Sequence, residues 1–327
     1  MPTISVIMSV YNGESYLKDS IDSILNQTFN DFEFIIVNDN SNDSSKEIIL
    51  SYADERIIYL ENKQNIGLAS SLNKAIKKAK GIFIARMDDD DISYADRFRL
   101  QVDFLESNPK IGIVGTYANL IGDRTGIRKH DKESDLLKLK SFFSCQFCHP
   151  TVMLRKAVLV DNNLSYNEAF TTAQDYELWS RLIRFTAFAT IPQILLDYRF
   201  HDKQLSSLKR KQQIKNTEII YANIFEMLQI DVSVQQIEIH KKLATLSFPI
   251  IEFSLSEIGK YIKVLMDANT SKSLVDPIIF NKFMSEYFYN IVKKAKTNSI
   301  QKILLYRNLG FDSHFLPKFA YLKLLLA

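Results

Sequence analysis

The chain has 327 residues, of which 46% are hydrophobic and 24% charged, and its formal net charge is +3. This length suits one large domain or two ordinary ones, and the composition is that of a globular protein. The near-neutral charge does not indicate nucleic acid as a partner. No apolar run is long enough for a membrane-spanning helix, and a strand pattern begins directly after Met1-Pro2-Thr3 without a signal peptide. We therefore expect a cytoplasmic protein.

Strand and helix patterns alternate through the first part of the chain. Short, β-branched apolar runs predict four strands, at residues 4–10, 32–37, 56–60 and 82–87. Amphipathic stripes predict three helices between them, at residues 17–25, 44–52 and 68–79. The spacing is that of βαβ units, so the sequence predicts a mostly parallel sheet with helices on both faces.

Polar residues follow three of these strands, in the loops at residues 11–13, 39–43 and 88–91. Ligands of parallel sheets bind beyond the carboxyl ends of the strands, so we expect the three loops to line one crevice. The glycine-rich phosphate-binding signatures of nicotinamide dehydrogenases and P-loop NTPases are absent from the sequence.

The third loop is a run of four adjacent aspartates, Asp88 to Asp91, directly after Arg86-Met87. Ionised carboxylates this close repel one another unless a cation lies among them. Hard oxygen ligands suit magnesium or manganese. The run therefore predicts a divalent metal site, with a solvated acidic turn as the alternative.

Beyond the aspartates the character of the chain changes. Ser93 is a candidate cap for a helix. Residues 111–126 predict a hairpin, residues 174–185 a helix, and residues 151–154 and 191–200 two further strands. From residue 204 onward only helical patterns occur. We expect an α/β domain over residues 1–210 and a helical C-terminal appendage over residues 211–327.

Cys145 and Cys148 have the C-x-x-C spacing. A zinc site would need a second pair, and no thioredoxin-like context surrounds them, so we expect free or buried thiols.

Four motifs occur in order: residues 5–12 (SVIMSVYN), 37–43 (VNDNSND), 85–91 (ARMDDDD) and 174–179 (QDYELW). In this order and spacing they resemble the successive motifs of family 2 glycosyltransferases, the inverting enzymes of the GT-A fold. The resemblance extends over residues 3–201. It implies a Rossmann-like, mostly parallel sheet, a metal held by an Asp-x-Asp motif, a nucleotide-sugar donor, and direct transfer with inversion at the anomeric carbon.

The resemblance also implies which residues bind the nucleoside. Asp39 matches the family's aspartate that accepts the uracil N–H, and Tyr11 and Asn12 flank the base and the ribose. As alternatives, Asn12 caps the first helix and Tyr11 is ordinary packing. The family often has Asp-Asp-Gly where this chain has Asn38-Asp39-Asn40. Asn tolerates left-handed backbone almost as Gly does, so we expect the loop to be kept.

For the diphosphate and the metal, the resemblance implies that Asp88 touches the ribose or diphosphate and that Asp90 ligates Mn²⁺ or Mg²⁺. His201 matches a histidine that closes over the metal or diphosphate, although a lone histidine is as often structural. Arg86 is expected to hold a donor phosphate or a neighbouring aspartate, with a structural ion pair as the alternative. The other two aspartates are expected to act as supporting charges around the metal and at the start of a helix: Asp89 and Asp91.

An inverting transfer needs a general base opposite the leaving group. Asp175 matches that base in the family, and a position at a helix start favours its ionised form. The usual preceding residue is Glu, and here it is Gln174. Glu177 lies two residues further on and points elsewhere on a helix. The alternative for Asp175 is a simple helix cap.

The C-terminal region combines apolar and basic residues, with eight Lys or Arg against Glu286 and Asp312 from Lys282 to the end. A basic amphipathic segment commonly lies on an anionic membrane surface, which would suit a lipid-linked glycan acceptor. A helical cap with a solvated basic face, or a homodimer contact, is the alternative.

We interpret the sequence as an inverting, metal-dependent glycosyltransferase. It would move a hexose or N-acetylhexosamine from a UDP-sugar to a glycan or lipid-linked glycan in surface polysaccharide synthesis. A nucleotidyltransferase would require a basic, glycine-rich phosphate loop, which residues 11–13 do not supply. The other alternative is a catalytically inactive homologue that binds nucleotide-sugar or acts as a scaffold, and Gln174 is the one feature that favours it.

Overall fold

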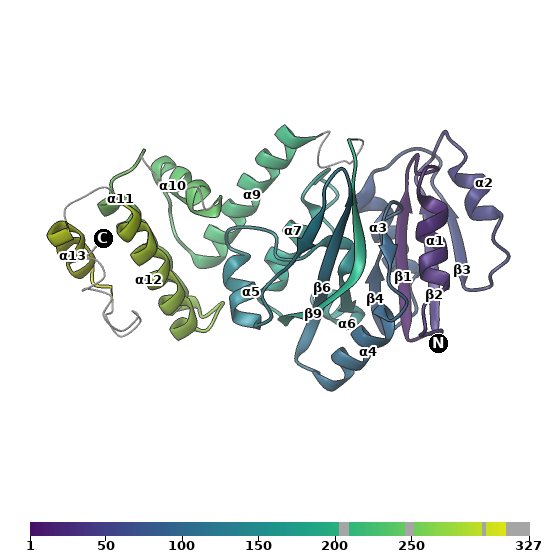
Figure 1. Ribbon diagram of the computed structural model, residues 1–327, viewed down its shortest axis with the longest axis horizontal. Helices are drawn as coiled ribbons and strands as arrows, with labels where there is room; N and C mark the ends of the chain where they lie inside the picture. The colour runs from purple at the N-terminus through teal and green to yellow at the C-terminus, as the bar shows by residue number, and fades with distance from the viewer. Residues whose placement is uncertain (203–208, 246–251, 296–298, 312–327) are drawn as a thin grey trace. The chain divides into compact units, whose positions relative to one another are not determined.

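The computed structural model describes residues 1–202, 209–245, 252–295 and 299–311 (Figure 1). Two compact units are present. The first contains residues 1–137 and 145–220, and the second contains residues 138–144 and the described residues from Tyr221 onward. The boundary expected after residue 210 lies at the start of helix α9 (Arg210–Leu228), whereas the division between the units falls inside that helix.

The first unit is built on a nine-stranded mixed sheet with the order β3-β2-β1-β4-β8-β6-β9-β5, and β7 pairs with β6. Strands β3, β2, β1 and β4 are mutually parallel, whereas β8 runs antiparallel to both β4 and β6. The strands are β1 (Ile4–Val10), β2 (Phe32–Asn38), β3 (Ile57–Glu61), β4 (Phe83–Arg86), β5 (Ile92–Ser93), β6 (Ile111–Gly122), β7 (Gly126–Arg128), β8 (Met153–Arg155) and β9 (Ala187–Phe200). The predicted mostly parallel α/β sheet is therefore confirmed.

Burial explains why β1 is an uninterrupted apolar run. Ile4, Val6, Met8 and Val10 belong to a core cluster that also contains the inward residues of the helices after β1 and β5. Ile7 points the other way and is 1% exposed, on a strand that also contacts α3. The helices and the 3₁₀ turn of this unit are α1 (Leu17–Leu25), α2 (Ser45–Leu50), α3 (Leu68–Lys78), α4 (Arg97–Ser107), α5 (Ser134–Lys140), η1 (His149–Thr151), α6 (Lys156–Asp161) and α7 (Gln174–Leu182).

The segment after the aspartates differs from the expected one. Ser93 does not cap a helix. It ends strand β5, and α4 begins only at Arg97, with Asp96 as its N-cap residue. The reason is pairing with β9, because Ile92 and Ser93 lie opposite Asp197 and Leu196 in antiparallel register. The chain therefore stays extended past the aspartates before it turns into the helix.

The second unit consists of helices. It contains the end of α9 with α10 (Val234–Ala244), α11 (Leu255–Lys272), α12 (Pro277–Lys294) and α13 (Ser299–Asn308). Its inserted segment, residues 138–144, is held by the fully buried His240, whose Nε2 lies 3.0 Å from the Phe142 carbonyl oxygen and whose Nδ1 lies 2.8 Å from the Tyr261 hydroxyl. The imidazole also stacks on Phe143. Burial lowers the pKa of His240 to about 4, so its neutral form belongs to the fold.

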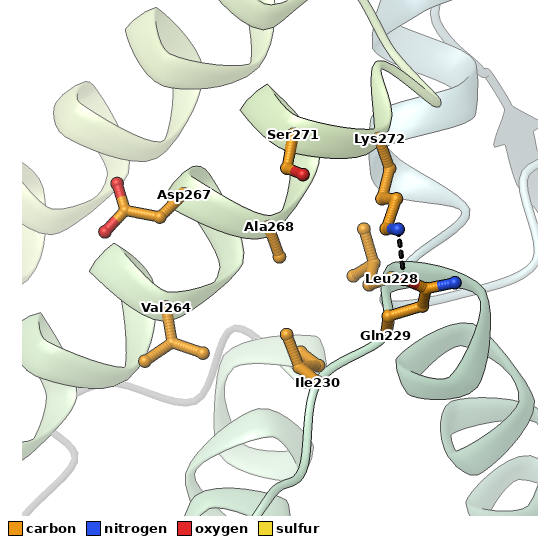
Figure 2. A pocket seen from close by; sticks show the side chains of 8 residues that line it. All are labelled: Leu228, Gln229, Ile230, Val264, Asp267, Ala268, Ser271 and Lys272. Carbon is orange, nitrogen blue, oxygen red and sulfur yellow. Dashed lines mark hydrogen bonds between the residues drawn. The ribbon is translucent and has the colours of Figure 1, made fainter.

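A shallow pocket of about 380 Å³ lies in the second unit, between the end of α9 and α11 (Figure 2). Its walls are mainly apolar, and Lys272 donates a hydrogen bond to Gln229 at its edge. None of the residues expected to act in catalysis lines it. Across the described residues, the helices are too short or too polar to cross a bilayer.

Candidate functional site

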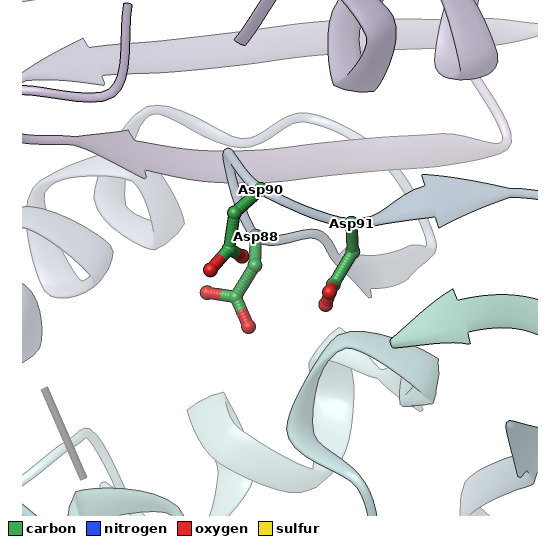
Figure 3. A group of neighbouring side chains, drawn as sticks. All are labelled: Asp88, Asp90 and Asp91. Carbon is green, nitrogen blue, oxygen red and sulfur yellow. The ribbon is translucent and has the colours of Figure 1, made fainter. Parts of the chain in front are cut away.

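Three carboxylates converge in the loop after β4 (Figure 3). Asp88, Asp90 and Asp91 each offer an oxygen, and these oxygens lie within 4.8 Å of one another. Burial, followed by the Asp88 charge, raises the pKa of Asp90. Burial, followed by the Asp90 charge, raises the pKa of Asp91 well above its usual range. A cation among the three oxygens would offset this repulsion.

Asp91 gives a direct test of whether the residues fit a metal. Its Oδ1 accepts a hydrogen bond of 2.8 Å from the Arg199 backbone N–H. Its Oδ2 is buried and has no hydrogen-bond partner among the described residues. Buried carboxylate oxygens need a partner, and a hard divalent ion supplies one. The aspartates therefore fit Mg²⁺ or Mn²⁺. Asp91 was expected to act only as a supporting charge, and the structure instead places it among the three converging carboxylates.

His201 lies beside the aspartate that was expected to bind metal. Its Nε2 is 2.9 Å from Asp90 Oδ2, across 111 residues of sequence. Arg199 supports the contact, because its Nε donates to the Asp90 carbonyl oxygen at 2.8 Å and its guanidinium lies over the Tyr16 ring. The structure thus brings together two residues that were expected to hold a metal and that lie 111 residues apart in the sequence.

Arg86 connects this loop to the sheet. Its side chain is 3% exposed and forms an ion pair with Asp88. Its Nε has no hydrogen-bond partner among the described residues. Its backbone carbonyl accepts a 2.7 Å hydrogen bond from Arg97, and burial lowers the pKa of Arg97 to about 9. The ion pair with Asp88 agrees both with holding a neighbouring aspartate and with the structural ion pair given as the alternative, and Nε is a buried donor without a hydrogen-bond partner among the described residues.

The loops after β1 and β2 are joined by the side chain of Asn12. Its Oδ1 accepts a 2.8 Å hydrogen bond from the Asn42 N–H, and its own N–H donates to Ser41 Oγ at 3.0 Å. A Cβ on Gly13 would come within 2.4 Å of Asp89 Oδ2, so the first loop also touches the aspartate loop. The predicted meeting of the three loops is confirmed. Tyr11 is 49% exposed beside them.

Asp39 lies at the carboxyl end of β2, directly after Asn38. Its carboxylate is 2% exposed and accepts three hydrogen bonds: from Asn62 Nδ2 (2.8 Å) and the Ile66 N–H (2.9 Å) on Oδ1, and from the Gly67 N–H (2.8 Å) on Oδ2. A carboxylate has about four acceptor positions, so Oδ2 retains one for a ligand. The following Asn40 has φ 61°, which agrees with the expectation that Asn replaces Gly in this loop.

Asp175 is the second residue of helix α7, after Ala173 with a left-handed φ of 56°. We expected the helix terminus to favour the ionised carboxylate, but burial has the larger effect and raises the pKa of Asp175. A raised pKa makes a carboxylate a stronger base near neutral pH. Glu177 is 2% exposed and pairs with Arg181 through contacts of 2.8 and 2.6 Å, so it is committed to the fold. Gln174 is buried.

Two other features of this unit are a buried histidine and the C-x-x-C cysteines. His149 is buried, with its Nε2 2.7 Å from the Tyr166 hydroxyl and its ring against Trp179. Burial lowers its pKa well below the usual range, which indicates a neutral, structural histidine. Cys145 and Cys148 are both free, as expected. Cys145 Sγ lies 3.5 Å from Asp175 Oδ2, a contact that no sequence pattern indicated.

Comparison with known proteins identifies the class. The family model for glycosyl transferase family 2 matches residues 5–163. An uncharacterized glycosyltransferase of Methanocaldococcus jannaschii is 37% identical over 222 residues, which cover 64% of this chain and 76% of the relative. The putative glycosyltransferase EpsE of Bacillus subtilis is 36% identical over 190 residues, covering 55% and 66%.

Solved structures agree on the fold. S. aureus TarS 1–349 in complex with UDP-GlcNAc has a TM-score of 0.60 and 19% identity, over 95% of this chain and 89% of TarS. The mannosyltransferase PcManGT from Pyrobaculum calidifontis in complex with GDP-Man and Mn²⁺ has a TM-score of 0.56 and 14% identity, over 92% and 87%. The fold is thus that of the GT-A glycosyltransferases. The chain belongs to glycosyl transferase family 2 and is a glycosyltransferase.

Proposed function

We propose that this enzyme transfers a hexose or N-acetylhexosamine from a UDP-sugar to a glycan or lipid-linked glycan, with inversion and with Mn²⁺ or Mg²⁺. The observation that carries the proposal is the cluster of Asp88, Asp90 and Asp91, with its unpartnered buried oxygen, in a loop that meets the loop of Asn12, which in turn contacts the loop of Asp39. Binding of UDP and UDP-GlcNAc by TarS, and of GDP-Man with Mn²⁺ by PcManGT, supports a nucleotide-sugar donor.

The donor would lie along the three loops. Asp39 Oδ2 accepts the N–H of uracil, and Tyr11 and Asn12 border the base and ribose. Asp88 faces the ribose or diphosphate at the metal, and the groups available to hold the metal are Asp88, Asp90, Asp91 and His201. When bound, the metal neutralises charge that develops on the departing diphosphate. Arg86, through its free Nε, adds a fixed positive charge at the same end.

Asp175 would act on the acceptor side. Its carboxylate takes the proton of an acceptor hydroxyl as that oxygen forms a bond to the anomeric carbon. The bond from this carbon to the UDP oxygen breaks on the opposite face, and the electron pair leaves with UDP. A single displacement of this kind inverts the configuration at the anomeric carbon. Since Glu177 is paired with Arg181, Asp175 remains the available base.

Release of UDP from UDP-GlcNAc and UDP-glucose tests the proposal in wild type and Asp175→Asn. Wild type should release UDP only when Mn²⁺ or Mg²⁺ is present, and Asp175→Asn should lose at least about 100-fold in rate while binding UDP as before. Unchanged turnover in the variant would remove the base assignment. Metal-dependent binding without turnover in wild type would favour the inactive homologue.

The acceptor proposal rests partly on the second unit, where an exposed stripe on α13 combines Ile300 (62% exposed) and Leu304 (50%) with the exposed Arg307. A stripe of this composition suits the anionic cytoplasmic surface of a membrane. Lys302 does not contribute, because it is 2% exposed and its Nζ donates to the Lys293 carbonyl oxygen at 3.2 Å. Lys296 and the apolar and basic residues of the expected segment from 312 to 327 lie outside the described residues. A homodimer contact is the alternative use of this stripe.

A further inference from the structure

One contact of the proposed base comes from the cysteine loop. Cys145 Sγ lies 3.5 Å from Asp175 Oδ2 and 3.4 Å from the Phe147 carbonyl oxygen, so its S–H is shared between two acceptors. Within the described residues, Cys145 is the only side chain that hydrogen-bonds to Asp175. We infer that Cys145 is a positioning residue, whose thiol holds Asp175 Oδ2 so that Oδ1 stays free for the acceptor hydroxyl. This inference rests on the proposed function.

The protonation state of the thiol fits this role. Burial, followed by the Asp175 charge, raises the pKa of Cys145 well above its usual range, so the sulfur stays protonated. A protonated thiol donates to a carboxylate, whereas a thiolate would repel it. The S–H group is also a weak donor. It fixes the direction of the carboxylate and takes away little of its basicity, whereas a strong donor at this place would stabilise the ionised form and make Asp175 a poorer base.

Other groups around Asp175 also act on its carboxylate. The backbone N–H of Tyr176 donates a hydrogen bond to it, and Arg86 from β4 and Arg128 from β7 lower its pKa through their positive charges. Tyr166, which precedes α7, is close enough to feel the Asp175 charge, and burial holds its phenol protonated. Neither arginine side chain nor the Tyr166 phenol hydrogen-bonds to the Asp175 carboxylate in the described structure. Removal of Cys145 should therefore take away its side-chain hydrogen bond and leave the Tyr176 backbone bond and the surrounding charges in place.

The chain contains a matched control. Cys148 belongs to the same loop and is 1% exposed, but its sulfur has no hydrogen bond to Asp175. Cys145→Ala and Cys148→Ala remove the same atom from two positions of one loop, of which the first is half-buried and the second buried. Cys145→Ser restores a donor at the first position. All three variants should be compared with wild type and Asp175→Asn by thermal melting and by the dissociation constant of UDP with Mn²⁺, which report folding and the donor site separately.

The decisive measurement is the pH profile of UDP release from saturating UDP-GlcNAc with Mn²⁺, where water serves as the acceptor and no glycan is needed. Loss of the thiol hydrogen bond in Cys145→Ala should move the midpoint of the acid limb to a pH that is higher by about half a unit to one unit. The rate at the acid end should then fall about threefold to tenfold. Cys145→Ser should return the limb to the wild-type position or below it. Cys148→Ala should leave the limb unchanged.

The results separate this inference from the proposed function. Equal acid limbs in Cys145→Ala, Cys148→Ala and wild type, with Asp175→Asn inactive, would overturn the role of Cys145 and leave the base assignment intact. A uniform loss of rate at every pH in Cys145→Ala, unrelieved by Cys145→Ser, would mean a structural residue and overturn it as well. Full turnover in Asp175→Asn would overturn both.

Discussion

Asp39→Asn tests the donor site through a single atom. In the structure, Asp39 Oδ1 accepts from Asn62 and Ile66, and Oδ2 accepts from Gly67 alone. The amide can keep the two bonds on Oδ1, but its NH₂ then faces the Gly67 N–H and offers no acceptor to uracil. An unpaired buried N–H costs about 1–3 kcal/mol. A missing acceptor for the uracil N–H should weaken UDP binding by a similar amount, which corresponds to about a tenfold to hundredfold rise in Kd.

Isothermal titration of UDP and CDP with Mn²⁺ present checks this. Wild type should prefer UDP, because the corresponding ring nitrogen of cytosine carries no hydrogen, and Asp39→Asn should lose that preference. Asn62→Ala serves as the control, since it removes one contact to Asp39 while the carboxylate stays. This control should melt at a lower temperature but keep the preference for UDP. Equal affinity for UDP in wild type and Asp39→Asn would refute the assignment of Asp39 to the base.

Three further outcomes are expected. Asp90→Asn should weaken Mn²⁺ binding to the UDP complex at least about tenfold, while the adjacent Asp89→Asn, outside the cluster, should change it little; titration by electron paramagnetic resonance measures both. Burial lowers the pKa of His240 from 6.5 to about 4. The neutral, buried imidazole therefore contributes fully to the free energy of unfolding above pH 6.5, and this contribution is lost as the pH falls toward 4. The loss is at most about 3 kcal/mol, and a His240→Gln variant should show a flatter decline in urea melts over that range. Ile300→Glu with Leu304→Glu should abolish sedimentation with phosphatidylglycerol vesicles, with phosphatidylcholine vesicles as the control, and equal sedimentation of both proteins would rule out this stripe as the contact.

Strands β1, β2 and β4 were predictable because they are buried on both faces. In β1 all residues but one are buried, so apolar and polar residues do not alternate along it. Its continuous apolar run can be recognised as a strand without any tertiary information. The segment after the aspartates was not predictable in the same way. Ser93 has the chemistry of a helix cap, but the antiparallel partner that keeps it extended, Leu196, comes about 100 residues later. At Ser93, pairing with a distant strand overrides the local preference for a helix cap.

The site shows the same limit. Motif spacing singled out Asp39, Asp90 and Asp175 as candidates, because each follows a strand or starts a helix that the pattern already marks. Asp91 and Cys145 were not candidates in the same way, since their contacts are with residues that are distant in the sequence. Asp91 Oδ1 is taken by Arg199, 108 residues away, which leaves the other oxygen for the metal cluster. Cys145 meets Asp175 only because the loop before η1 folds against the start of α7.

The charge of Arg86 acts on both sides of the proposed site, the donor side at Asp88 and the acceptor side at Asp175. Its guanidinium pairs with Asp88 at the metal loop, and the same charge lowers the pKa of Asp175 at the start of α7. Because the side chain is only 3% exposed, water screens this charge poorly, and both carboxylates respond to it. Substitution of Arg86 is therefore expected to disturb both halves of the proposed site, nucleotide binding and proton removal. Asp39, bound to the loop after β3, and Cys145, bound to the proposed base, are the positions where a substitution should change one half alone.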